Sequence, residues 1–252
     1  MITRAELIAY LDEQLEVSRF QDYCPNGLQV EGKPEINTLV TGVTASQALL
    51  EAAVEHNADA LMVHHGYFWR GEAPTVTGIK YQRLKMLINN DMNLIGYHLP
   101  LDAHVEFGNN VQLAKILNIE IDGFIAGTGE PAIGFWGKLA TSQTLDEFSS
   151  YIACQLDRKP TIIAGHDRLI KTVGWCTGAA QGYIQQAAES GLDAFISGEA
   201  SEQTTHLARE LGIHYIAAGH HATERYGVKS LGEHLALKFG LQHYFIDIDN
   251  PV

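Results

Sequence analysis

Short apolar runs alternate with amphipathic stretches along the chain, a pattern typical of an α/β protein. Residues 38–41 and 59–63 are apolar runs that predict buried strands, with a turn at 42–44, and residues 46–57 have helical spacing. This strand–helix–strand order predicts a parallel pair joined by a right-handed crossover. The same pattern predicts further elements, namely helices over 80–90 and 108–117 and strands over 93–97 and 132–140.

The second half of the chain repeats the first. Residues 46–63 align with residues 180–197, and each segment is a helix followed by an apolar strand. The alignment matches Asp59 with Asp193 and places His64-His65 over Gly198-Glu199. The repeat predicts an α/β fold of two similar lobes, with strand ends that converge on one cleft.

The division between the lobes is expected near residue 127, where Gly127-Thr128-Gly129 has the composition of a turn. We therefore expect an N-terminal α/β lobe over residues 1–127 and a C-terminal α/β lobe over residues 128–252, whose last segment could pack back on the first lobe. Helix starts are expected where Thr3 precedes Glu6 and Thr144 precedes Glu147, each pair spaced for a capping box.

Histidines follow the predicted strands. His64 and His65 stand at the carboxyl end of the 59–63 run, the edge where open α/β sheets place their chemistry. Adjacent side chains in a strand point to opposite faces, but at a strand end each ring could reach a different metal ion. The competing interpretation is a pair of histidines in a solvated loop.

A histidine followed four residues later by a carboxylate occurs in both halves: His98 precedes Asp102, and His220 precedes Glu224. Imidazole and carboxylate together suit zinc, manganese, iron or nickel, and the donors outnumber what one tetrahedral ion needs. Two divalent ions bridged by a carboxylate and a water would use them all. The alternative is a set of strand ends whose histidines have ordinary polar partners.

The local sequence limits each role. Pro100 excludes an ordinary helix interior, so Asp102 is expected on a loop. His98 could be a ligand or could orient one, and helical spacing to the following acid favours His220 over His221 as a ligand. Among the other histidines, His56 and His206 are predicted to be structural, and His104 is compatible with either role.

The composition excludes several classes. A formal net charge of -13 argues against a nucleic-acid partner, since binding phosphates needs a positive face. No apolar run is long enough to span a bilayer, so no membrane association is expected. No secretory leader is recognisable, and the three cysteines are widely spaced, with no spacing typical of a disulfide scaffold or a zinc-binding pair. These features predict a cytoplasmic protein.

Several stretches, in order along the chain, resemble the Nif-three-like family of GTP cyclohydrolase I type 2 homologues, especially its YbgI-like bacterial members. The stretches are PNGLQVEG, TGVTASQALL, LMVHHGYFW, YHLPLD, SGEASEQTTH and AAGHHATER. The resemblance implies a dinuclear metal centre between two α/β lobes and a toroidal homohexamer built as a trimer of dimers. It implies metal ligands at His64, His65, Asp102, His220 and bridging Glu224, with His98 in a supporting place behind them.

The leading hypothesis for function is a metal-dependent hydrolase that uses a metal-activated bridging water. The family name suggests ring opening of GTP, so a nucleotide or other small molecule is the expected substrate. A two-metal phosphoesterase or peptidase is a second enzyme hypothesis. A non-catalytic metal-binding assembly or interaction protein is the alternative from another class. The loop Tyr67-Phe68-Trp69-Arg70 could stack on a base and meet a phosphate, or could be a subunit contact.

Overall fold

The computed structural model describes residues 1–252 and has a mixed α/β fold. Contacts between residues divide the chain into two compact units. Unit 1 comprises Met1–Leu101 and Gly227–Asp249, and unit 2 comprises Asp102–Tyr226 and Asn250–Val252. None of the helices combines the length and the apolar character that crossing a membrane requires.

Unit 1 contains a five-stranded sheet in the order β13-β4-β5-β6-β2. The first four strands in this order run parallel, and β2 pairs antiparallel with β6. The strand bounds are β2 (Gly27–Val30), β4 (Thr38–Thr44), β5 (Ala60–His65), β6 (Asn93–Gly96) and β13 (Gln242–Phe245). A separate antiparallel pair joins β1 (Ile2–Thr3) to β3 (Glu35–Ile36).

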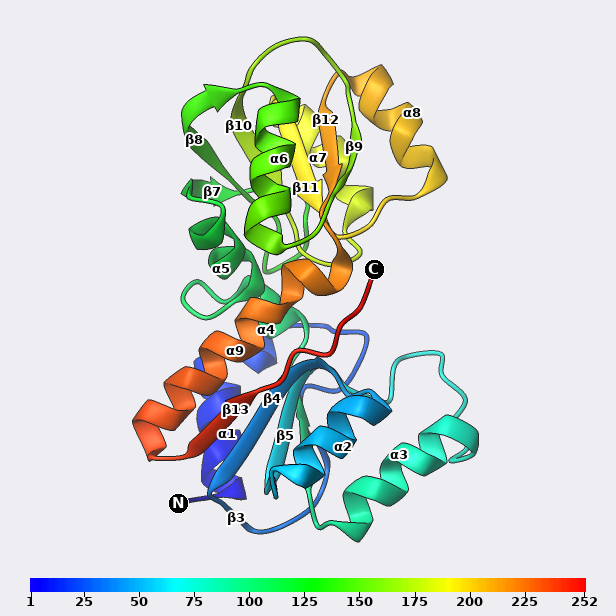
Figure 1. Cartoon of the computed structure of the whole chain (residues 1–252), viewed down its shortest axis with the longest axis vertical. Coiled ribbons are helices and arrows are strands. Elements are labelled where there is room, and N and C mark those ends of the chain that lie inside the picture. Colours follow the sequence, from blue (N-terminus) through cyan, green and yellow to red (C-terminus); the bar gives the residue numbers. More distant parts are fainter. The chain divides into compact units, whose positions relative to one another are not determined.

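Helices cover both faces of this sheet (Figure 1). One core joins β4, β5 and β6 to α2 and α3 through buried aliphatic side chains such as Leu50, Leu61 and Leu87. On the other side, Tyr10 of α1 packs edge-on against Phe239 of α9. The helix bounds in this unit are α1 (Arg4–Gln14), α2 (Gln47–Glu55), α3 (Gly78–Asn89), the start of α4 (Leu99–Ala103), the later part of α9 (His220–Phe239) and the short η1 (Val17–Arg19).

In unit 1, one local prediction is confirmed and another is wrong. The capping box of Thr3 and Glu6 is present at the start of α1. The predicted turn at residues 42–44 is wrong, because β4 continues through Thr44. Its last residues pair in parallel with β5, Gly42 beside Val63 and Thr44 beside His65.

Unit 2 contains a six-stranded sheet in the order β7-β8-β10-β11-β12-β9. Its three central strands are parallel, and the flanking strands are antiparallel to them or to one another. The strand bounds are β7 (Ile119–Phe124), β8 (Phe135–Gln143), β9 (Thr161–Ile163), β10 (Ile170–Trp175), β11 (Ala194–Ser197) and β12 (His214–Ala217).

Two separate cores flank the second sheet. One contains Leu113 of α5 and Phe148 of α6, and the other contains Ile184 of α7 and Ala208 of α8. The predicted capping box of Thr144 is present at the start of α6. The helix bounds are α5 (Asn109–Ile116), α6 (Leu145–Leu156), η2 (Gln181–Tyr183), α7 (Ile184–Glu189) and α8 (Glu202–Leu211).

The units divide at Leu101, earlier than the expected residue 127. Residues 102–127 belong with unit 2 because β7 pairs with β8, which in turn pairs with β10. The chain returns to unit 1 at Gly227, and β13 there adds a parallel strand beside β4. The C-terminal segment therefore contributes to the first sheet.

Each unit carries the same supersecondary succession, β4-α2-β5-α3-β6 in unit 1 and β10-α7-β11-α8-β12 in unit 2. The two matched aspartates have the same role. Oδ2 of Asp59 accepts hydrogen bonds from the backbone N–H groups of Asn37 and Thr38, and Oδ2 of Asp193 accepts from Lys171 and Thr172. Each carboxylate thus fastens the start of one strand to the start of its parallel neighbour.

We predict that Asp193→Ala lowers the free energy of unfolding by about 2 kcal/mol at neutral pH, because two strand N–H groups lose a charged acceptor. Burial alone would raise the pKa of Asp193, but hydrogen bonds from Thr172 and Lys171 hold it below its ordinary value of 3.8. This stabilisation is present above about pH 4 and is lost as the pH falls through the folded-state pKa.

Denaturant unfolding of the wild type and the variant between pH 3 and pH 7 measures this effect. The difference between them should shrink below about pH 4. Glu210→Ala, an exposed carboxylate of α8, is the control and should change stability by less than about 0.5 kcal/mol. A difference between wild type and Asp193→Ala that is independent of pH would contradict the prediction.

Candidate metal centre

Three histidines of unit 1 converge at the carboxyl ends of two parallel strands. His64 and His65 end β5, and His98 follows β6 by two residues. One ring nitrogen of each lies within 4.8 Å of the others. The centroids of the His64 and His65 rings are 4.5 Å apart, so the strand end brings the two adjacent side chains together. This is the arrangement predicted for a strand end and differs from the alternation within a strand.

The two strand-end rings are each anchored through Nδ1. Nδ1 of His64 lies 3.0 Å from the carbonyl oxygen of Tyr97. Because that oxygen only accepts, Nδ1 carries a proton, and Nε2 is the nitrogen left to face a ligand. Nδ1 of His65 lies 3.1 Å from the hydroxyl of Thr44, the last residue of β4. The extension of β4 that the sequence pattern missed therefore supplies one anchor.

A carboxylate anchors the third ring. Nδ1 of His98 lies 2.7 Å from Oδ1 of Asp22, whose other oxygen accepts from the Leu99 N–H and the Asn26 side chain. Burial alone would raise the pKa of Asp22, but the bonds from His98, Asn26 and Leu99 lower it to about 2. Asp22 is therefore a carboxylate at neutral pH, and it directs Nε2 of His98 away from itself.

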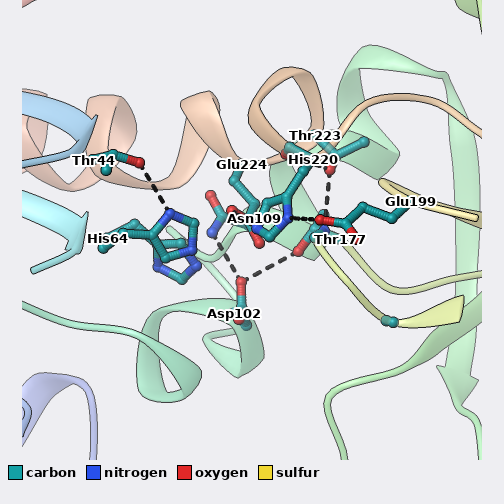
Figure 2. A network of polar contacts seen from close by, with 12 residues as sticks. Thr44, His64, Asp102, Asn109, Thr177, Glu199, His220, Thr223 and Glu224 are labelled. Carbon is teal, nitrogen blue, oxygen red and sulfur yellow. Dashed lines mark hydrogen bonds and ion pairs between the residues drawn. The ribbon is translucent and has the colours of Figure 1, made fainter. Parts of the chain in front are cut away.

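In unit 2, Asp102 lies on the short helix α4 and is buried. Its Oδ1 accepts hydrogen bonds from the Asn109 side chain at 2.9 Å and the Thr177 hydroxyl at 3.2 Å (Figure 2). The predicted loop position is wrong, because Pro100 lies in the first turn of α4, where a missing N–H breaks no helical hydrogen bond. The two donors fix the carboxylate in one orientation.

His220 and Glu224 lie one turn apart at the start of α9, as their spacing predicted. Nε2 of His220 is 3.1 Å from Oε2 of Glu224, and Nδ1 is 2.7 Å from Oε1 of Glu199 (Figure 2). Burial alone would lower the pKa of His220, but the two carboxylates raise it to about 9. The surroundings of this ring thus favour positive charge.

A glycine lies beside His220 and Glu224. Gly178 has a φ of +68°, and a Cβ there would lie 2.1 Å from Oε1 of Glu224 and 3.2 Å from Nε2 of His220. The neighbouring residue Thr177 binds Asp102, so one short loop borders both Asp102 and Glu224. Only glycine fits this position without moving Glu224.

His56, His104, His206 and His221 have partners of other kinds. His56 stacks on Tyr244 with ring centroids 4.3 Å apart. His206 pairs with Glu202 one turn earlier on the exposed face of α8. Nδ1 of His104 accepts from the N–H groups of the following Glu106 and Phe107. His221 is buried, and its backbone N–H donates to the carbonyl of Val252.

Asp22 and Glu199 are the residues that sequence reasoning missed. Asp22 lies in a connecting loop, and no periodicity marks it. Glu199 could have been found from the sequence, because the repeat aligns it with His65. In both units, the anchoring carboxylate lies 2.7 Å from Nδ1 of a histidine that precedes an acid by four residues.

The donor set fits a divalent ion. It consists of imidazole nitrogens and carboxylate oxygens, the ligands of open sites for zinc, iron, manganese or nickel. Cys24, with Asp22 and His98, forms a further group whose ligand atoms lie within 4.8 Å of one another, and burial raises the pKa of its thiol to about 12. Among the candidate donors, the rings of His98 and His220 are each anchored by a carboxylate.

Comparison with known proteins identifies the family. The family model described as Duf34/NIF3 (NGG1p interacting factor 3) matches residues 2–251. The chain belongs to the Duf34/NIF3 family. The resemblance seen in the motifs is thereby confirmed.

Individual members of the Duf34/NIF3 family are similar along their whole length. A Pseudomonas aeruginosa protein named GTP cyclohydrolase 1 type 2 homolog is 53% identical over 251 residues, covering 99% of each chain. A solved structure described as protein ybgI, of unknown function, is 50% identical with a TM-score of 0.96 and covers all of both chains. A solved structure from Thermus thermophilus, of the protein TTHA1606, is 33% identical with a TM-score of 0.89, again over both chains in full.

We predict that Gly178→Ala lowers the free energy of unfolding by more than about 1 kcal/mol, because alanine is strained at positive φ and its Cβ meets Glu224. Gly182→Ala is the matched control, since a Cβ at Gly182 would meet no atom within 4 Å. Thermal unfolding of both variants checks the prediction. Equal melting temperatures for the two variants would contradict it.

Proposed function

We propose that this chain is a dinuclear-metal-dependent hydrolase. The proposed ligands of two divalent ions are His64, His65, Asp102, His220 and Glu224, with His98 in a supporting place. The observation that carries the proposal is the repeated pairing of a histidine Nδ1 with a carboxylate, Asp22 in one unit and Glu199 in the other. Such pairs fix ring orientation and raise the basicity of the other nitrogen toward a metal.

The type of donor favours catalysis over a purely structural ion. Structural zinc sites are closed and mostly use thiolates, whereas histidine and carboxylate sites keep positions open for water or substrate. Divalent ions in such a site polarise an electrophile and allow water to act as a nucleophile near neutral pH. Asn109 and Thr177 would keep Asp102 in its ligating orientation, and Gly178 leaves room for Glu224.

The name of the relatives supports a reaction class to test first. Several are called GTP cyclohydrolase 1 type 2 homolog, which indicates hydrolytic opening of a purine ring. We therefore propose a nucleotide as the substrate. The homohexamer, a trimer of dimers, and the cytoplasmic location stay predictions, and analytical ultracentrifugation of the purified chain would test the number of subunits.

We predict about two ions per wild-type chain by elemental analysis after metal loading, and loss of metal in Glu224→Gln and His64→Ala. Matched controls are Glu202→Gln and His206→Ala, which remove the same side chains from the exposed pair on α8 and should keep the wild-type metal content. Wild type that holds no metal under replete conditions would overturn the proposal.

Turnover on the loaded protein then separates the hypotheses for function. GTP consumed without release of phosphate supports ring opening, whereas cleavage of phosphodiesters or dipeptides supports the second enzyme hypothesis. Absence of turnover, together with loss of assembly on metal removal, would replace the hydrolase with a metal-dependent assembly protein.

The anchoring carboxylates give a separate prediction. Asp22→Asn and Glu199→Gln should each weaken metal binding by about 10- to 100-fold, because the ring loses a charged acceptor at Nδ1. Glu202→Gln is again the control, since Glu202 faces a histidine outside the donor set. Competition with a calibrated chelator measures the affinity. Wild-type affinity in both Asp22→Asn and Glu199→Gln would show that anchoring does not matter.

A further inference from the structure

Two aromatic side chains flank the histidine group of unit 1. The ring of Trp69 is 5.0 Å from that of His98 at 81° and 5.9 Å from that of His65. The ring of Tyr23 approaches His98 from a different loop, at 6.3 Å and 64°. Tyr23 is 58% exposed, and Trp69 is partly buried. Aromatic surface open to solvent therefore lies directly beside candidate metal ligands.

The two loops are fastened to each other. The backbone N–H of Arg70 donates to the carbonyl of Tyr23 at 2.7 Å, and its guanidinium donates to the carbonyl of Asp22 at 3.1 Å. The indole N–H of Trp69 donates to the carbonyl of Gly66. These bonds hold the two loops together and fix the indole of Trp69, and Arg70 remains exposed.

The backbone is strained at the residue that places Trp69. Phe68 has a φ of +65°, a left-handed conformation that bulky side chains rarely adopt. Strain of this kind persists where the surrounding structure imposes it, and it gathers at ligand-binding sites. Here it turns the chain so that Trp69 faces the histidines and Phe68 lies under the ammonium group of Lys80.

We propose that Trp69 and Tyr23 form a stacking surface for a planar nitrogen heterocycle and that Arg70 binds an anionic group on the same ligand. The proposal rests on the proposed function, since it names the substrate class of that site. Aromatic faces bind heterocyclic bases by stacking, and the guanidinium group suits phosphate or carboxylate. The exposed arginine provides a local positive charge beside the stacking surface, in a chain whose net charge is -13.

Calorimetric titration of the intact, metal-loaded protein with guanosine and with GMP tests both parts. Trp69→Leu and Tyr23→Leu should each weaken guanosine binding about tenfold, while Trp69→Phe keeps most of the affinity. Arg70→Gln should reduce the preference for GMP over guanosine. Tyr81→Leu, an exposed aromatic of α3 whose ring lies beside Lys85, is the control and should bind like wild type.

Equal guanosine affinity in wild type and in both leucine variants would overturn the stacking surface, as would no binding at all. An unchanged preference for GMP in Arg70→Gln would overturn the anionic subsite. Metal content is measured on the same samples. Guanosine binding that depends on Trp69 in a protein without metal would keep this proposal while the proposed function fails. A metal-loaded protein whose guanosine binding is unchanged by these substitutions would overturn this proposal and leave the proposed function standing.

Discussion

An imidazole can present one nitrogen to a ligand in a fixed direction only if its other nitrogen is held, and this requirement accounts for much of the polar structure described above. The carboxylates of Asp22 and Glu199 hold His98 and His220 in the same way, at Nδ1 and at 2.7 Å. A carboxylate is the stronger anchor because the hydrogen bond is charge-assisted once the ring is bound to a cation or a proton. The loops that carry these acids are therefore part of the site.

The residues that fasten the parallel strands together and the candidate metal donors lie at opposite ends of the strands. Asp59 and Asp193 fasten strands at their amino ends, where each carboxylate is satisfied by backbone N–H groups. The candidate donors lie at the opposite ends, where β5 finishes with His65 and His98 follows β6. The carboxyl ends of parallel strands are where open α/β sheets bind their ligands. The apolar core lies between these two ends, in residues such as Leu61 and Leu94.

Sequence reasoning succeeded where one local rule decides the outcome. Helical spacing placed His220 and Glu224 on one turn, and the repeat predicted the shared strand–helix succession. It failed at β4, where tertiary pairing overrides local preference, because the strand runs through Gly42 beside β5. It failed at Asp102 because Pro100 lies in the first turn of α4, where proline does not break a helix. Asp22 could not be found from its loop, since only the folded chain brings it to His98.

The two repeats are not equivalent at their donor positions, and the difference bears on what the proposed centre would bind. Where unit 1 has His65, unit 2 has Glu199, which anchors a ring and is not itself a proposed ligand. Unit 1 therefore contributes imidazoles, and the proposed ligand carboxylates are Asp102 and Glu224. Two carboxylates leave two divalent ions with net positive charge. Such a centre would favour an anionic substrate and the negative charge that develops during hydrolysis.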